Sequence, residues 1–120
     1  MEIIDVPDST GHLDVDYPVW AKIALESMKK YDGIYVHIKG PDEPAHDGDF
    51  LKKKEVIEAI DKYFFASLLP QLDAKNTILA VTADHSTACS VKAHTSDPVP
   101  LLVFGGKIKP DGTLCFSEKK

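Results

Sequence analysis

The feature that most constrains the fold of this 120-residue chain is the uninterrupted apolar run TILAVTA, residues 77–83. A strand with one solvated face alternates apolar and polar side chains, but this run carries apolar side chains on both faces. It is therefore typical of a strand in a parallel sheet that helices cover on both sides. An acid and an imidazole, Asp84 and His85, follow directly after the run.

Helices and other strands are expected to alternate along the chain around this run. Apolar residues recur at helical spacing in two segments, one with Pro18 in its first turn and one ending near Pro70. Two further segments are β-branched or apolar and stop at glycine or proline, as strands do. The expected elements are helices at 18–30 and 49–70 and strands at 33–38, 77–83 and 98–104. This order predicts a single α/β domain over residues 1–120, with a parallel sheet and helices packed on it.

Composition excludes several classes of function. The net charge of -5 and the pI of about 5.4 argue against binding to nucleic acid or an anionic membrane, which requires a basic surface. No apolar run approaches the length of a bilayer, and the N-terminus lacks the pattern of a signal peptide. Cys89 and Cys115 stand far apart, which indicates neither a disulfide framework nor a sulfur-rich zinc site. The predicted location is the reducing cytoplasm.

The expected sheet gathers metal-binding residue types at one rim. Ligands of open parallel sheets bind beyond the carboxyl ends of the strands. Asp84 and His85 follow one strand, Asp42 and His46 lie in the loop after another, and His94 precedes the last strand. Taken singly, an Asp in a turn and a His in a loop are ordinary. Together they predict a bound cation, because clustered carboxylates repel one another without one, and the mixed ligands favour zinc, manganese or iron over magnesium.

Three segments of the sequence resemble a known family. PDEPAH, TADHST and AHTSDPVP are similar to the metal-binding segments of the archaeal-type cofactor-independent phosphoglycerate mutases, within the alkaline-phosphatase superfamily. STGHLDVDY and YVHIKGPDEPAHDGD also resemble that family, so the likeness runs from about Ser9 to Phe104. The resemblance implies a partial alkaline-phosphatase-like core, and thus a metal-binding phosphatase-like domain.

The resemblance also implies an activity and its site. Asp42, His46 and His94 would bind one divalent metal, and Asp84 and His85 would belong to a second. The metals would be manganese or zinc, with magnesium or cobalt as alternatives, and no organic cofactor is expected. In the family a serine accepts the phosphoryl group and returns it to the other hydroxyl of glycerate. This interconverts 3-phosphoglycerate and 2-phosphoglycerate in glycolysis and gluconeogenesis, which makes phosphoglycerate the expected substrate.

The sequence departs from the family at the nucleophile. No segment matches the family's serine nucleophile or the aspartate that completes its second metal site, and the chain contains no arginine. It looks like the carboxyl-terminal portion of a longer enzyme, and we expect it to be inactive as a mutase alone. Ser86 is not predicted as a nucleophile, because no G-x-S-x-G elbow surrounds it. Lys39 and Lys92 either contact a phosphate at the rim or are solvated loop residues.

Two other classes of function stay open. A metal-dependent phosphatase or phosphodiesterase of the same superfamily would use the same metal ligands. A noncatalytic metal-binding or assembly fragment is the second alternative. A partial sheet leaves an open edge and uncovered apolar surface, so self-association or docking of a complementing segment is expected.

Overall fold

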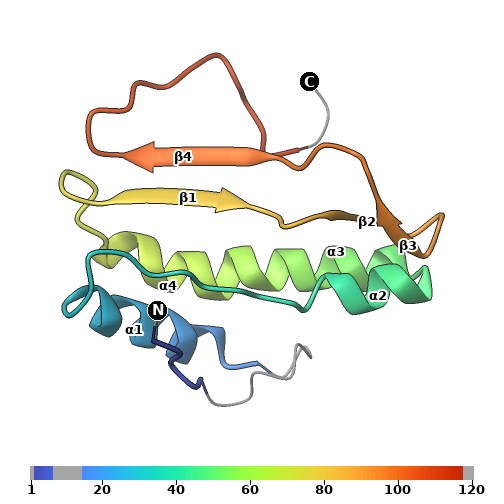
Figure 1. Ribbon diagram of the computed structural model, residues 1–120, viewed down its shortest axis with the longest axis horizontal. Coiled ribbons are helices and arrows are strands. Elements are labelled where there is room, and N and C mark those ends of the chain that lie inside the picture. The colour runs from blue at the N-terminus through green and yellow to red at the C-terminus, as the bar shows by residue number, and fades with distance from the viewer. Residues whose placement is uncertain (1, 7–14, 118–120) are drawn as a thin grey trace.

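The computed structural model describes residues 2–6 and 15–117. Two paired strands run beside a layer of helices (Figure 1). The helices are α1 (Tyr17–Met28), α2 (Asp42–Asp47), α3 (Phe50–Ala59), η1 (Ile60–Phe65), α4 (Ala66–Leu68) and η2 (Leu69–Gln71). The strands are β1 (Ile78–Thr82), β2 (Ser86–Ala88), β3 (Ala93–Thr95) and β4 (Leu101–Gly105).

Helix α1 confirms the first predicted helix. The Asp16 side chain caps its N-terminus by accepting a 3.2 Å hydrogen bond from the Val19 backbone N–H. Its buried residues recur at intervals of three and four, which places them on one face. They are Tyr17, Trp20, Ala21, Ala24 and Ser27. This face packs against η1 and α4, where Phe64 and Leu68 complete the main apolar core.

The second predicted helix is one helical run with a change of winding inside it. α3, η1, α4 and η2 follow one another from Phe50 to Gln71, and η1 is a π-helical stretch within the run. The buried side chains of the run include Val56, Phe64 and Leu68. Beyond Gln71 the backbone becomes extended at Leu72, close to the predicted end at Pro70.

The strands pair in two antiparallel ribbons. β1 pairs with β4, with Ala80 opposite Val103. β2 pairs with β3, with Thr87 opposite His94. β1 and β4 confirm the predicted strands at 77–83 and 98–104, with small differences at their ends.

The predicted parallel sheet is wrong for the described residues, where both sheets are two-stranded and antiparallel. The α/β content is confirmed, but the chain passes from β1 to β4 through the β2–β3 hairpin and not through a crossover helix. Without a crossover helix the two strands run in opposite directions. The third predicted strand is not confirmed, because residues 33–38 do not form a strand and pair with no described strand. Among the described residues, no helix is long and apolar enough to cross a bilayer.

Candidate metal centre

The first part of the site is a short helix where the sequence predicted a loop. Helix α2 begins at Asp42 and ends at Asp47, and Gly48 follows it in the left-handed conformation with φ of 80°. Asp42 and His46 are four residues apart, so the helix places them on one face. Their closest atoms, Asp42 Oδ1 and His46 Nε2, are 3.4 Å apart.

The second part of the site is the β2–β3 hairpin. Thr87 lies directly opposite His94, so both side chains occupy the same face of the ribbon. His85 precedes Thr87 by two residues and extends this face, because alternate residues of an extended chain share a side. The His85 ring stacks on the His94 ring, with centroids 3.7 Å apart and an interplanar angle of 27°.

The helix and the hairpin meet at their imidazoles. His94 Nε2 is 3.1 Å from His46 Nε2 and 3.6 Å from Asp42 Oδ1. Asp42, His46 and His94 thus form a cluster of side chains that could hold a metal ion. The structure therefore brings together the residues that the family resemblance assigned to the first metal, although they come from segments more than 40 residues apart.

The spacing of the three ligand atoms fits one small cation. Ligand atoms about 2.1 Å from a tetrahedral zinc ion lie about 3.4 Å from one another. The three separations here are 3.1, 3.4 and 3.6 Å. One carboxylate oxygen and two imidazole nitrogens also match the ligands that zinc and manganese accept.

A hydrogen bond from the other ring nitrogen holds His46 in the tautomer that a metal requires. His46 Nδ1 lies 3.2 Å from the backbone carbonyl oxygen of Lys92. A carbonyl oxygen only accepts, so Nδ1 carries a proton, and in the neutral form of the ring the lone pair is on Nε2. That nitrogen faces Asp42 and His94. Metal-bound histidines in proteins are commonly oriented in this way.

Thr87 fixes which ring nitrogen of a second histidine, His85, carries the proton. Its hydroxyl donates a 2.8 Å hydrogen bond to Asp42 Oδ1, which uses its only proton. His85 Nδ1, 3.1 Å from the same hydroxyl, must therefore be the donor in their contact. In its neutral form the His85 ring then has its lone pair on Nε2, 3.5 Å from Asp84 Oδ2. Sequence reasoning missed Thr87, although its two-residue offset from His85 after the strand was a usable signal.

The surroundings of Asp42 stabilise its charged carboxylate. Burial acts to raise the pKa of this carboxyl, since its side chain is only 20% exposed. The hydrogen bond from Thr87 and the positive charge that His46, His94 and His85 carry when protonated outweigh burial and place the pKa below its ordinary value. The carboxylate is therefore in the ionised form that binds a cation.

The residues predicted for the second metal lie beside the first cluster. Asp84 Oδ2 is 3.5 Å from His85 Nε2 and 3.9 Å from His37 Nε2. All three side chains are partly exposed. His85 connects the two groups, because it touches Asp84 on one side and His94 on the other.

The two lysines predicted at the rim lie close to α2. The Lys92 side chain lies against Gly48, and its backbone carbonyl contacts His46. Lys39 is exposed, and its carbonyl accepts a 3.0 Å hydrogen bond from the Asp42 N–H. These backbone contacts position ligands. A role of either side chain in binding phosphate stays a prediction.

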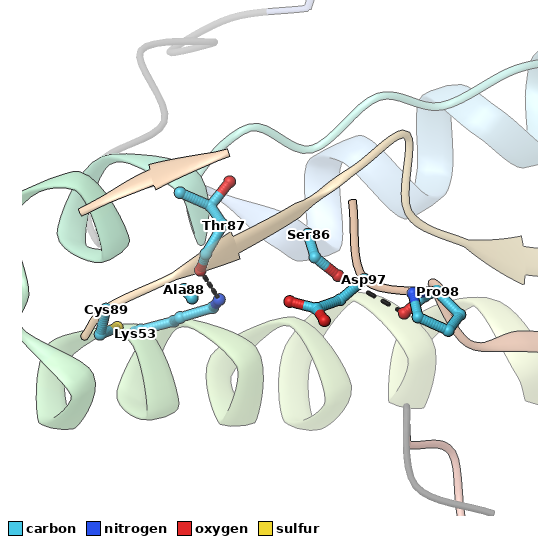
Figure 2. Close-up of a pocket in the computed structure, with 7 residues that line it drawn as sticks. All are labelled: Lys53, Ser86, Thr87, Ala88, Cys89, Asp97 and Pro98. Atoms are coloured by element: carbon cyan, nitrogen blue, oxygen red, sulfur yellow. Dashed lines mark hydrogen bonds between the residues drawn. The ribbon is translucent and has the colours of Figure 1, made fainter. Parts of the chain in front are cut away.

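A cavity of about 310 Å³ lies beside β2. Figure 2 shows Lys53 reaching from α3 to the backbone of β2, where its ammonium donates a 2.7 Å hydrogen bond to the Thr87 carbonyl. The Thr87 side chain points away from Lys53 in the same view. Ser86 directs its hydroxyl to the Pro98 carbonyl at 3.5 Å. Lys53 thus ties the helical layer to the strand that carries Thr87.

The comparisons with known proteins identify the family of this chain. Residues 1–119 match the family model described as the metalloenzyme superfamily. The chain belongs to this superfamily. It is homologous to a segment of archaeal 2,3-bisphosphoglycerate-independent phosphoglycerate mutases, which confirms the family resemblance seen in the sequence. Part of the resembling loop, residues 9–14, lies outside the described residues.

Individual relatives of this superfamily member are substantially longer. The 2,3-bisphosphoglycerate-independent phosphoglycerate mutase of Methanoculleus marisnigri is 43% identical over 98% of this chain, and that of Ignicoccus hospitalis is 42% identical over 99%. In both, the match spans 28% of the relative. The structure of the PH0037 protein from Pyrococcus horikoshii is 37% identical, with a TM-score of 0.87 over 93% of this chain and 29% of that one.

Proposed function

We propose that this chain carries the metal-binding part of an enzyme that interconverts 3-phosphoglycerate and 2-phosphoglycerate by metal-dependent phosphoryl transfer. The observation that carries the proposal is the cluster of Asp42 Oδ1, His46 Nε2 and His94 Nε2 within 3.6 Å of one another. The relatives named as phosphoglycerate mutases support the choice of reaction, since they match this chain along nearly its whole length.

Each residue has a defined task in this proposal. Asp42, His46 and His94 hold the first divalent metal, and Asp84 and His85 contribute to a second. A bound divalent metal would withdraw charge from phosphoryl oxygens and activate a hydroxyl as a nucleophile. Thr87 positions the Asp42 carboxylate, and the Lys92 carbonyl keeps His46 Nε2 free for coordination.

We place the nucleophilic serine in the part of the longer relatives that lies outside the segment matched by this chain. Ser86 donates to the Pro98 carbonyl and lies on the side of β2 that lines the cavity. The chain also has no arginine for two-point binding of a phosphate or a carboxylate. The proposed activity therefore requires the remaining part of a longer enzyme.

The test is the stoichiometry of metal binding. The chain is stripped with a chelator, reloaded with manganese or zinc, and assayed for metal bound per chain beside His46→Ala and His94→Ala. We expect about one tightly held ion, lost in both variants, because each removes one of three ligands. His37→Ala is the matched control, since His37 lies outside the three-residue cluster, and it should retain that ion.

Equal binding by wild type and both histidine variants would overturn the metal site. A second assay separates binding from chemistry. The chain is mixed with the part of the Methanoculleus marisnigri relative outside the match, and interconversion of the two phosphoglycerates is followed. Activity that requires both polypeptides and is abolished by His94→Ala supports the mutase. Hydrolysis of phosphate esters without interconversion would instead identify a phosphatase.

A further inference from the structure

Lys53 makes a different kind of contact from the lysines on either side of it. Lys52 and Lys54 form exposed ion pairs with glutamates of helix α3. Lys53 pairs with no carboxylate among the described residues, and its ammonium instead donates a 2.7 Å hydrogen bond to the Thr87 carbonyl in partly buried surroundings. A hydrogen bond from a charged donor is about twice as strong as one between neutral groups. The contact therefore holds the Thr87 peptide firmly.

Lys53 and Asp42 belong to one continuous helical unit. The Asp49 side chain accepts a 2.9 Å hydrogen bond from the Lys52 N–H and caps α3, which places Lys53 in the first turn of that helix. The Asp49 N–H in turn donates a 2.8 Å hydrogen bond to the Pro44 carbonyl of α2. The start of α3 is thus fixed to the helix that carries Asp42.

This helical unit holds Thr87 at two points. Asp42 accepts the 2.8 Å hydrogen bond of the Thr87 hydroxyl, and Lys53 donates to the carbonyl of the same residue. Figure 2 shows that the Thr87 side chain points away from Lys53, so the two contacts restrain β2 from different sides. With both in place, β2 can neither slide along the helices nor rotate about its own axis without breaking one of them.

The position of the Thr87 hydroxyl matters for two of the proposed metal ligands. It donates to Asp42 Oδ1 at 2.8 Å and accepts from His85 Nδ1 at 3.1 Å, and hydrogen bonds weaken steeply outside such distances. Thr87 is only 5% exposed, so water has little access to replace a lost partner. Metal ligands have to be held to within about 0.5 Å of their productive positions. A shift of β2 therefore disturbs the ligand geometry.

We propose that Lys53 is a positioning residue of the candidate metal centre and acts on metal binding through the Thr87 hydroxyl. By fixing the Thr87 carbonyl, it keeps the hydroxyl in reach of Asp42 and His85. This inference rests on the proposed function, and it gives a role in that function to a residue outside the ligand set. A lysine that only stabilised the fold would leave the metal affinity of the folded chain unchanged.

A double-mutant cycle tests the path from Lys53 through Thr87. Manganese affinity is measured for wild type, Lys53→Met, Thr87→Val and the double variant, at a temperature where each is folded by circular dichroism. We expect Lys53→Met to weaken the affinity about tenfold, the lower end of the range for loss of an outer contact. In the Thr87→Val background the same change should have an effect within about twofold, because the hydroxyl through which Lys53 acts is already gone.

Further variants separate the hydrogen bond from other effects of the substitution. Lys53→Arg restores a cationic donor and should recover most of the affinity that Lys53→Met loses. Lys54→Met is the matched control, because it removes only an exposed ion pair with Glu58 of the same helix, and it should bind metal as wild type does. If Lys53→Met does not fold, Lys53→Gln takes its place. Its neutral amide weakens the contact, so the same pattern is expected with a smaller loss.

A metal-free measurement keeps this inference separate from the proposed function. Long-range nitrogen–proton NMR at about pH 8.5, where histidine is neutral, shows which ring nitrogen of His85 carries the proton. Wild type should carry it on Nδ1, because the Thr87 hydroxyl donates to Asp42 and can only accept from His85. We expect Lys53→Met to move part of the population to the Nε2–H tautomer. This readout decides the role of Lys53 even if wild type binds no metal, a result that would overturn the proposed function alone.

Three results would overturn the role of Lys53. The first is a wild type that binds manganese with the same affinity as Lys53→Met. The second is an equal loss of affinity in the wild-type and Thr87→Val backgrounds, which would show that Lys53 does not act through the Thr87 hydroxyl. The third applies if wild type binds no metal, and it is a His85 tautomer that Lys53→Met leaves unchanged.

Discussion

The Thr87 hydroxyl donates a 2.8 Å hydrogen bond to Asp42 Oδ1, although the two residues are 45 positions apart in the chain. Thr87 is buried, and its hydroxyl also accepts from His85 Nδ1. A single side chain thus fixes a carboxylate and the tautomer of an imidazole. This makes Thr87 the link between α2 and the β2–β3 hairpin.

Thr87→Val should weaken metal binding while keeping the shape of the side chain. The valine cannot donate to Asp42, so the carboxylate loses the partner that orients it and lowers its pKa. Loss of such an outer contact weakens metal affinity by about 10–100-fold in known sites. Competition with a chromogenic chelator measures the change. Thr82→Val is the control, since its hydroxyl contacts Pro100 instead. Identical affinities for Thr87→Val and wild type would contradict the assignment.

Lys53→Met should destabilise the fold through loss of a contact between layers. The Lys53 ammonium donates a 2.7 Å hydrogen bond to the Thr87 carbonyl, which lies in a partly buried place. Losing a hydrogen bond from a charged donor costs about 1.5–3 kcal/mol. Urea unfolding measures the free energy. Lys54→Met is the control, because it removes only an exposed ion pair with Glu58 of the same helix. If Lys54→Met lowered the free energy of unfolding as much as Lys53→Met does, this explanation would be refuted.

Gly48→Ala should strain the turn between α2 and α3. Gly48 has φ of 80°, and an added Cβ would lie 2.6 Å from Lys92 Cε and 3.3 Å from the Cys89 carbonyl oxygen. The unfavourable backbone alone costs about 1–2 kcal/mol. Thermal unfolding of the variant is compared with Gly33→Ala, where an added Cβ meets no atom within 4 Å. We expect a clearly lower midpoint for Gly48→Ala. Equal midpoints would show that the turn relaxes freely.

Asp73 should titrate below its ordinary range. Hydrogen bonds from the Asn76 side chain and the Lys75 backbone N–H lower the pKa of its carboxyl. The pKa of Asp73 is lower in the folded chain than in the unfolded chain. The ionised carboxylate therefore contributes its full stabilisation above the pKa of the unfolded chain, and this contribution is lost as pH falls through the folded pKa. NMR titration of the carboxyl measures this directly. Asn76→Ala should move the pKa upward, and an unmoved value would disprove the cause.

The local elements could be predicted because their signals are local. The spacing of Trp20 and Ala24 defines a buried helical face within one segment, and the run from Ile78 to Thr82 is recognisably a strand without reference to any neighbour. The residue types at Asp42, His46 and His94 likewise indicated a metal before any geometry was known. The prediction of strand direction failed, because antiparallel or parallel pairing depends on which segments become neighbours.

The sequence alone determined helix α1, the helical run that begins with α3, strands β1 and β4, and the ligand residues of the candidate site, because periodicity and ligand chemistry are properties of short segments. Only the tertiary structure decided the antiparallel pairing of β1 with β4, the roles of Thr87 and Lys53, and the tautomers of His46 and His85. Each of these depends on contacts between segments distant in the chain. Such contacts form when packing brings the segments together, and no local pattern records them.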